Sequence, residues 1–411
     1  MTTLSSQEIM LAAALVFGIA TFCQVVAPLL RVPGLILLLP AGFLLGLVAP
    51  QFRMDQILGP AFSVGVDLIV ALILFQGGLE LGTIQLQDQH RHVVRRLVWI
   101  GAPVTWIVGS VAAHYLIGLS WSLALLLGAI LVVSGPTVVT PILDFARPNA
   151  KVRGILMWEG TMLDPLGGIF AVVVFQVVRV SSSGGPVEAI LAFLASIAVA
   201  VIVAVAAIVV AVLGTKAVRG NTTLGVQLVV GSVLAGSAFA NYLSAGSGLL
   251  VALLMGVSAR PISKRLGTSL EHTTPFFNTV ASLGVGVLFV SITAVVPSPL
   301  VATVALPAIG MALVLILVAR PAVAAYCTRK AGLTRNERAF IGWMDPRGIV
   351  AAATASSVGA SLVAADIPGA AKLLPAAFVI ITVTVFVYGL TATPVAKMLG
   401  VQAPADATQD A

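Results

Sequence analysis

The chain has 411 residues, of which 59% are hydrophobic and only 9% are charged, and its mean hydropathy is +1.10. These values lie far outside the range of soluble proteins. Solidly apolar stretches of about 20 residues recur from end to end, which is typical of a polytopic all-α membrane protein and not of a transmembrane β-barrel, whose strands alternate polar and apolar residues.

Apolar runs, and the glycines, prolines and polar clusters between them, predict about 13 membrane spans. We expect them at 8–30, 33–49, 61–84, 97–117, 121–143, 154–178, 187–213, 222–241, 244–259, 272–296, 299–326, 338–361 and 372–396. Special spans in matching places favour an inverted repeat, with halves at about 8–178 and 222–396 and a linker helix at about 187–213. These elements form one transmembrane domain over 1–398, followed by a short cytoplasmic tail at 399–411.

The basic residues separate strongly between the two sets of loops that these spans define. One set holds 17 Lys and Arg residues, and the other holds only Arg53, Arg179 and Lys372. Because positively charged loops stay in the cytoplasm, the asymmetry predicts a cytoplasmic C-terminus and an outside N-terminus in the cell membrane. It also explains the net charge of +7 without a nucleic-acid partner.

Two spans are interrupted by residues that cannot continue a regular helix. The first contains "VVSGPTVVTP" at 132–141, and the second contains "WMDPRG" at 343–348. Proline removes a helical hydrogen bond, so Pro136 frees the carbonyl of Val132, and Pro346 frees that of Gly342. Free carbonyls are costly in hydrocarbon, and we therefore expect both breaks to line a wet cavity or to bind a cation.

Asp164 is the strongest candidate for a functional charge inside the membrane. It lies near the middle of its span with no basic residue within about ten positions in sequence. Pro165 frees the carbonyl of Thr161, which adds an oxygen ligand one turn before the acid. A carboxylate in such a place holds either a proton or a monovalent cation, and competition between the two is the basis of an exchanger.

Glu159 lies on the same helix but on another face. Five residues at 100° each place it about 140° around the helix from Asp164, so the two acids cannot share one ligand face. Arg320, in "LVARPAV", lies at a similar depth, and we predict a structural ion pair between it and Glu159. Arg347, at the second break, is predicted to neutralise helix C-terminal dipoles and to repel surplus cations.

The remaining polar residues of the spans receive smaller roles. Asp67 and Glu80 are expected at interfaces or pore mouths, and Asp345 is expected to cap the half-helix that follows the second break. His90 and His92 are placed in a basic loop, and the sequence contains no credible metal cluster. The glycines of "GGLELG" (77–82) are expected to allow close helix packing.

Four motifs together resemble the monovalent cation:proton antiporters, in the NhaP-like branch that includes the sodium/proton exchangers. They are "WEGTMLDPLGG", "VVSGPTVVTPIL", "LVARPAV" and "FIGWMDPRGIVAAATAS". The resemblance implies an NhaA/NhaP-like inverted-repeat fold with two discontinuous crossing helices, in which a six-helix core moves against a dimerisation domain as an elevator. It implies that Asp164 binds cation and proton, that Thr137 belongs to the first extended segment, that Glu159 and Arg320 form a core ion pair, and that Arg347 belongs to the second extended segment.

Three positions depart from the pattern of this family. Leu163 stands where relatives usually carry Asn or Asp, Gln76 stands where many carry Glu, and Gly160 stands where some carry Ser. A site poorer in charge is less committed to Na⁺, so K⁺ is a serious option. One titratable aspartate indicates electroneutral exchange.

We therefore predict a secondary active Na⁺ or K⁺/H⁺ antiporter rather than an enzyme, with Asp164, Thr137, Thr161 and Gln76 as cation- or proton-binding residues. Its partners are the monovalent cation, the proton, membrane lipid and a second copy in a homodimer. No cofactor and no resident metal are expected. Two alternatives stay open at this point, a cation channel of the same fold and a sodium-coupled organic anion carrier.

Overall fold

The structure is a computed structural model that describes residues 6–30, 32–81, 88–180, 186–218, 221–244, 247–266 and 274–403. Over these ranges the regular elements are helices, and one isolated bridge pairs Pro148 with Gln402. The helices are α1 Ser6–Leu29, α2 Leu35–Val48, α3 Met54–Leu58, α4 Pro60–Leu81, α5 Asp88–Arg96, α6 Ala102–Ala112, α7 Trp121–Ile130, α8 Pro136–Ala146, α9 Ala150–Val180, α10 Pro186–Ala217, α11 Thr222–Leu243, α12 Ser247–Leu266, α13 Thr274–Val295, α14 Ser298–Val314, α15 Arg320–Cys327, α16 Arg335–Trp343, α17 Ile349–Ala364 and α18 Leu373–Met398.

Within the described part of the chain, nine helices are long and apolar enough to cross a membrane, and five shorter apolar helices accompany them. The predicted polytopic helical architecture is therefore confirmed, while the count of 13 spans and their division into two repeats stay predictions. Both predicted interruptions are present. The chain leaves α7 after Ile130 and starts α8 at Pro136, and it leaves α16 after Trp343 and starts α17 at Ile349.

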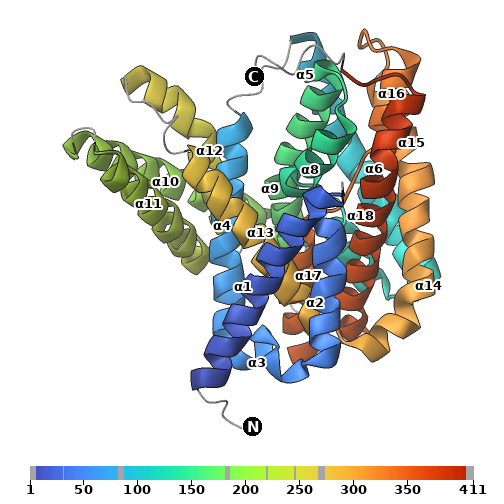
Figure 1. Cartoon of the computed structure of the whole chain (residues 1–411), viewed down its shortest axis with the longest axis horizontal. Coiled ribbons are helices and arrows are strands. Elements are labelled where there is room, and N and C mark those ends of the chain that lie inside the picture. The colour runs from blue at the N-terminus through green and yellow to red at the C-terminus, as the bar shows by residue number, and fades with distance from the viewer. Residues whose placement is uncertain are drawn as a thin grey trace.

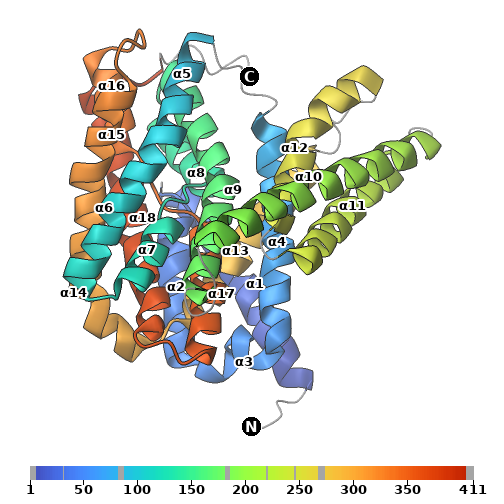
Figure 2. The same cartoon turned by 180° about the vertical axis from the view of Figure 1, so that it is seen from behind.

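The helices form two sets that pack mostly within themselves. The first set is α1 to α4 with α10 to α13, and the second set is α5 to α9 with α14 to α18. Figure 1 shows the first set on one side of the molecule, with α10 and α11 lying side by side at its edge, and Figure 2 shows the same division from behind. Helices α8, α9 and α17 lie where the two sets meet.

Glycines allow the closest contact within the first set. A Cβ atom at Gly78 of α4 would come within 2.8 Å of the backbone nitrogen of Val257, and one at Gly256 of α12 would collide with the carbonyl of Phe75. The backbones of α4 and α12 therefore touch, as small residues permit in membrane helices. This contact confirms the packing role predicted for the "GGLELG" stretch, of which Gly82 lies outside the described residues.

Arginines from several elements gather at one end of the molecule, and we call this end the basic face. It holds the end of α5 with Arg96, the turn between α8 and α9 with Arg147, the first turn of α9 with Arg153, and the start of α16. The predicted basic loop with His90 and His92 is wrong, because both residues lie in α5, which continues through π-helical turns into α6 and on to Ile117.

Asn149 joins three segments at the basic face. Its side-chain oxygen accepts from the backbone N–H of Val152 and caps α9, while its amide donates to Glu337 Oε1 at 2.9 Å. Its backbone N–H donates to the carbonyl of Val401. Burial acts to raise the pKa of Glu337, but hydrogen bonds from the Thr334 backbone and from Asn149 hold it below its usual value.

Candidate functional site

The two breaks cross each other at a pair of glycines. A Cβ atom added at Gly348 would lie 3.2 Å from the backbone nitrogen of Gly135 and 3.5 Å from its Cα. Two extended segments can approach so closely only where neither residue carries a side chain. Both glycines have extended backbone angles and directly precede a half-helix, α8 or α17.

The carboxylate of Asp164 lies against this crossing. It projects from the middle of α9, and a Cβ atom at Gly135 would come within 2.5 Å of Asp164 Oδ2, while one at Gly348 would lie 3.9 Å from Oδ1. The side chain is 1% exposed, and neither carboxylate oxygen has a hydrogen-bond partner among the residues that the structure describes. A buried carboxylate without a donor is costly, so the geometry leaves this group able to take a proton or a cation.

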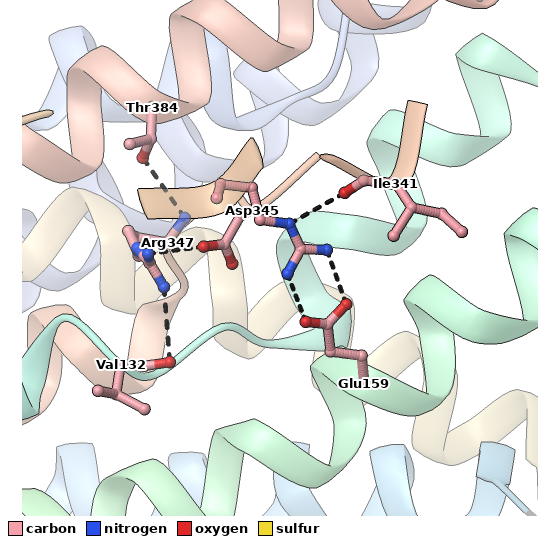
Figure 3. A network of polar contacts seen from close by, with 7 residues as sticks. Val132, Glu159, Ile341, Asp345, Arg347 and Thr384 are labelled. Carbon is pink, nitrogen blue, oxygen red and sulfur yellow. Dashed lines mark hydrogen bonds and ion pairs between the residues drawn. The ribbon is translucent and has the colours of Figure 1, made fainter. Parts of the chain in front are cut away.

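Glu159 has a different environment on the same helix. Arg320 Nη1 and Nη2 donate to its two carboxylate oxygens at 2.5 and 2.8 Å, and Arg320 Nε donates to the carbonyl of Ile341 at 2.9 Å (Figure 3). Both charged side chains are buried. The contact predicted between Glu159 and Arg320 is therefore present. Arg320 also binds a carbonyl in the last turn of α16, where carbonyl groups have no hydrogen-bond partner within the helix.

Asp345 and Arg347 form a second buried ion pair within the second break. Arg347 Nη2 donates to Asp345 Oδ2 at 2.7 Å, and Nη1 reaches the carbonyl of Val132 at 3.5 Å (Figure 3). Val132 follows the end of α7, so Arg347 places positive charge near that helix C-terminus, where the dipole favours it. The capping role predicted for Asp345 is wrong, because Gly348 precedes α17 and no side chain caps it. The arginine two residues away is the stronger partner for the carboxylate.

The other predicted site residues lie around the crossing with different contacts. Thr137 is in the first turn of α8, and its hydroxyl oxygen is buried without a partner in the described chain. The hydroxyl of Thr161 donates to the carbonyl of Met157 at 2.7 Å. Gln76 is buried on α4, and its amide donates to Asn278 Oδ1 at 3.1 Å. Roles in cation or proton binding stay predictions for all three.

Two cavities lie on opposite sides of the crossing. The basic-side cavity has a volume of about 600 Å³, is bounded by α1, α2, α4, α8 and α13, and includes Thr137 and Gln76 in its wall. The opposite-side cavity has a volume of about 470 Å³, is bounded mainly by α4 and α17 with further residues from α3, α14 and α18, and includes Asp67. Each cavity is thus lined by first-set helices and by a half-helix of the second set. The side chain of Glu80, the other acid predicted at a pore mouth, lies outside the described residues.

Asn278 is a polar residue of the basic-side cavity that the sequence did not single out. It is exposed on α13 and lies 202 residues after Gln76, so no local pattern links the two. A signal was available, since an amide inside an otherwise apolar span is expensive and marks a functional position. Leu163, in contrast, is buried and apolar beside Asp164, as its sequence position suggested.

Two broken helices that cross beside a buried acid are the architecture of secondary ion transporters. Residues 12–398 match the family described as "Sodium/hydrogen exchanger, transmembrane", and the chain therefore belongs to the sodium/hydrogen exchanger family. It is 24% identical over 405 residues to the K(+)/H(+) antiporter NhaP2 of Shewanella sp. (strain MR-4), an alignment that covers 97% of this chain and 68% of the relative. It is 26% identical over 406 residues to the K(+)/H(+) antiporter NhaP of Alkalimonas amylolytica, covering 96% and 68%.

The fold also matches a solved antiporter structure. The sodium proton antiporter MjNhaP1 from Methanocaldococcus jannaschii, at pH 8, superposes with a TM-score of 0.78 at 20% sequence identity, and the match covers 96% of this chain and all of that chain. At this identity the similarity establishes the shared fold. The NhaP-type architecture predicted from the motifs is therefore confirmed.

Proposed function

We propose that this protein exchanges a monovalent cation, Na⁺ or K⁺, for H⁺ across a membrane, with Asp164 binding the two in turn. One observation carries the proposal. Four acids are buried in the described chain, and three of them have partners: Glu159 has Arg320, Asp345 has Arg347, and Glu337 has Thr334 and Asn149. Asp164 has none, and it lies at the crossing of the two breaks.

The chemistry of the site fits a cation that competes with a proton. An unpaired carboxylate in a buried site is unfavourable, so Asp164 holds either a proton or a cation. Release of the one therefore favours binding of the other. The names of the relatives, K(+)/H(+) antiporters and a sodium proton antiporter, support this class of cargo. Both ions stay candidates for the cation.

The two cavities support an alternating-access movement of the elevator type. A single site at the crossing can serve both sides of the membrane if the second set of helices slides against the first, so that one cavity deepens while the other closes. Because Leu163 is apolar and Asp345 is paired with Arg347, Asp164 is the one unpaired acid among the described residues at the crossing, which supports one-for-one, electroneutral exchange. By the distribution of basic residues, the basic face is cytoplasmic, and we expect the protein to act as a homodimer in the cell membrane, where this exchange serves pH homeostasis.

A flux assay in proteoliposomes tests the proposal. With an imposed pH gradient and an internal pH dye, addition of Na⁺ or K⁺ should move protons in the wild type, and an outward cation gradient should drive protons uphill. Uphill movement separates an antiporter from a passive channel. Asp164→Asn should abolish the cation-dependent signal, and Asp366→Asn, the same change in an exposed turn, should retain it. Unchanged flux in Asp164→Asn would refute the assignment.

A further inference from the structure

The wall of the basic-side cavity divides into a core side and a scaffold side. The half-helix α8 provides the core side, with Thr137, Thr140 and Asp144. The first-set helices provide the scaffold side, on which the polar residues are amides and hydroxyls: Gln24, Gln76, Asn278 and Ser282. In the described lining, the scaffold thus offers neutral oxygen and nitrogen groups and no carboxylate to an ion approaching the crossing.

The amides are held in place by bonds between scaffold helices. Gln76 Nε2 on α4 donates to Asn278 Oδ1 on α13, and Gln24 Nε2 on α1 donates to the backbone carbonyl of Ser282, one turn further along α13. Asn278, Ala281, Ser282 and Val285 all line the cavity, and their spacing places them on one face of α13. Asn278 therefore stands in the cavity wall, where its bond to Gln76 holds it.

The pair also lies close to the acid site. Gly77, the residue after Gln76, packs against Pro136 and Thr161, since a Cβ atom there would lie 3.3 Å from Pro136 Cγ and 3.7 Å from Thr161 Cγ2. Pro136 directly follows Gly135, against which Asp164 lies. An ion that enters from the basic-side cavity consequently passes the carboxamide pair immediately before it reaches the crossing.

We propose that Asn278 determines cation specificity, and that the Gln76–Asn278 carboxamide pair biases the exchanger toward K⁺ over Na⁺. The inference rests on the proposed function. Selection among alkali cations depends on the number and field strength of the oxygen dipoles that replace water. Na⁺ is the more strongly hydrated ion, and it requires strong anionic ligands to offset its dehydration. A neutral carboxamide is a weaker ligand than a carboxylate, so amides that line the path to the acid favour the larger and less strongly hydrated K⁺.

A purely structural role for the pair predicts something different. If the hydrogen bond only ties α4 to α13, loss of Asn278 weakens the protein and lowers turnover equally with both ions. A specificity role changes the ratio of the two affinities instead. Because hydrogen bonds to charged groups are worth roughly twice those to neutral ones, a carboxylate at this position should shift the Na⁺/K⁺ ratio by about tenfold.

The test compares the apparent KM values for K⁺ and Na⁺ in proteoliposomes for the wild type, Asn278→Asp, Asn278→Ala and the control Thr279→Ala, which changes the next residue of α13, an exposed threonine outside the cavity lining. The wild type should prefer K⁺, Asn278→Asp should shift the ratio toward Na⁺ by about tenfold, and Asn278→Ala should reduce the discrimination. Thr279→Ala should keep the wild-type ratio. A wild-type preference for Na⁺, or an unchanged ratio in both Asn278 variants, overturns the inference.

A binding measurement separates this inference from the proposed function. The thermal stabilisation of detergent-purified protein by K⁺ and by Na⁺ reports affinity without transport. Suppose that the wild type moves no protons in response to a cation, that K⁺ stabilises it more strongly than Na⁺, and that Asn278→Asp reverses this order. The proposed exchange is then refuted, while the specificity assignment of Asn278 stands. If Asn278→Asp does not fold, Asn278→Ser removes the carboxamide without introducing a charge, and a wild-type ratio in that variant overturns the assignment.

Discussion

Removal of the charge of Glu159 should destabilise the protein strongly while leaving the acid at the crossing intact. In Glu159→Gln, the guanidinium of Arg320 keeps one acceptor and meets an amide NH₂ group where the second carboxylate oxygen stood. Two charge-assisted bonds, at 2.5 and 2.8 Å, are therefore reduced to one weaker bond in a site where both residues are 4% exposed. Breaking one side of such a buried pair costs about 3–5 kcal/mol. At roughly 2 °C per kcal/mol for a large chain, the melting temperature should fall by roughly 6–10 °C.

Thermal unfolding of the purified variants measures this effect. The double variant Glu159→Leu with Arg320→Met removes both charges and should recover most of the lost stability, since an apolar pair of similar volume often replaces a buried ion pair at little cost. Asp366→Asn, which removes a carboxylate charge in the exposed turn after α17, should stay within about 0.5 kcal/mol of the wild type. If Glu159→Gln melts like the wild type but no longer binds cation, the ion pair is part of the transport site and the structural assignment is wrong.

Two further changes test the crossing and the basic face. Gly135→Ala places a methyl group against Asp164 and should lower the exchange rate in the flux assay by about 100-fold. The control Gly18→Ala, in open space on α1, should leave the rate within twofold of the wild type. A normal rate in Gly135→Ala would show that the crossing tolerates displacement. Asn149→Ala removes the cap of α9 and the bond to Glu337 and should cost about 1–2 kcal/mol at neutral pH. The pKa of Glu337 is lowered in the folded chain, so its carboxylate stabilises the fold above about pH 4.5, and this stabilisation is lost as the pH falls further. The difference in unfolding free energy between Asn149→Ala and the wild type should therefore be smaller at acid pH than at neutral pH. If the stability lost in Asn149→Ala does not change with pH, the bond to Glu337 makes no part of that loss.

The elements of this fold that the sequence predicts are those whose cause is local. Proline and glycine specify where α7 and α16 end, because the missing hydrogen bonds act within four residues. The angle between Glu159 and Asp164 follows from helix geometry alone, and it correctly indicates that the two acids have different partners. Helix packing at Gly78 is likewise visible as a small residue in an apolar run.

Contacts between distant segments were predicted less completely. Asp345 can cap a helix or pair with Arg347, and the outcome depends on how the second break crosses the first, which no local pattern encodes. The bond between Gln76 and Asn278 joins helices from different halves of the chain, and the sequence analysis identified only the first of the two residues. The helical conformation of 88–96 was missed because seven of its nine residues are polar or charged, so no apolar run marks it as a helix.

Helix α4 contributes to the walls of both cavities, and it gives a scale for the elevator movement that we propose. Asp67 lies in the wall of the opposite-side cavity and Gln76 in that of the basic-side cavity. Nine residues of helix separate them, a rise of about 13 Å at 1.5 Å per residue. Asp164 lies in the second set of helices, and α4 belongs to the first set. If α4 stays fixed, the crossing has to travel a comparable distance along it to face each cavity in turn. Among the described residues, the buried ion pairs of Glu159 and Asp345 are formed within the second set, so the proposed movement need not break them. The charges that hold the second set together can therefore travel with the unpaired acid, which is the only one of the three that has to change its occupant.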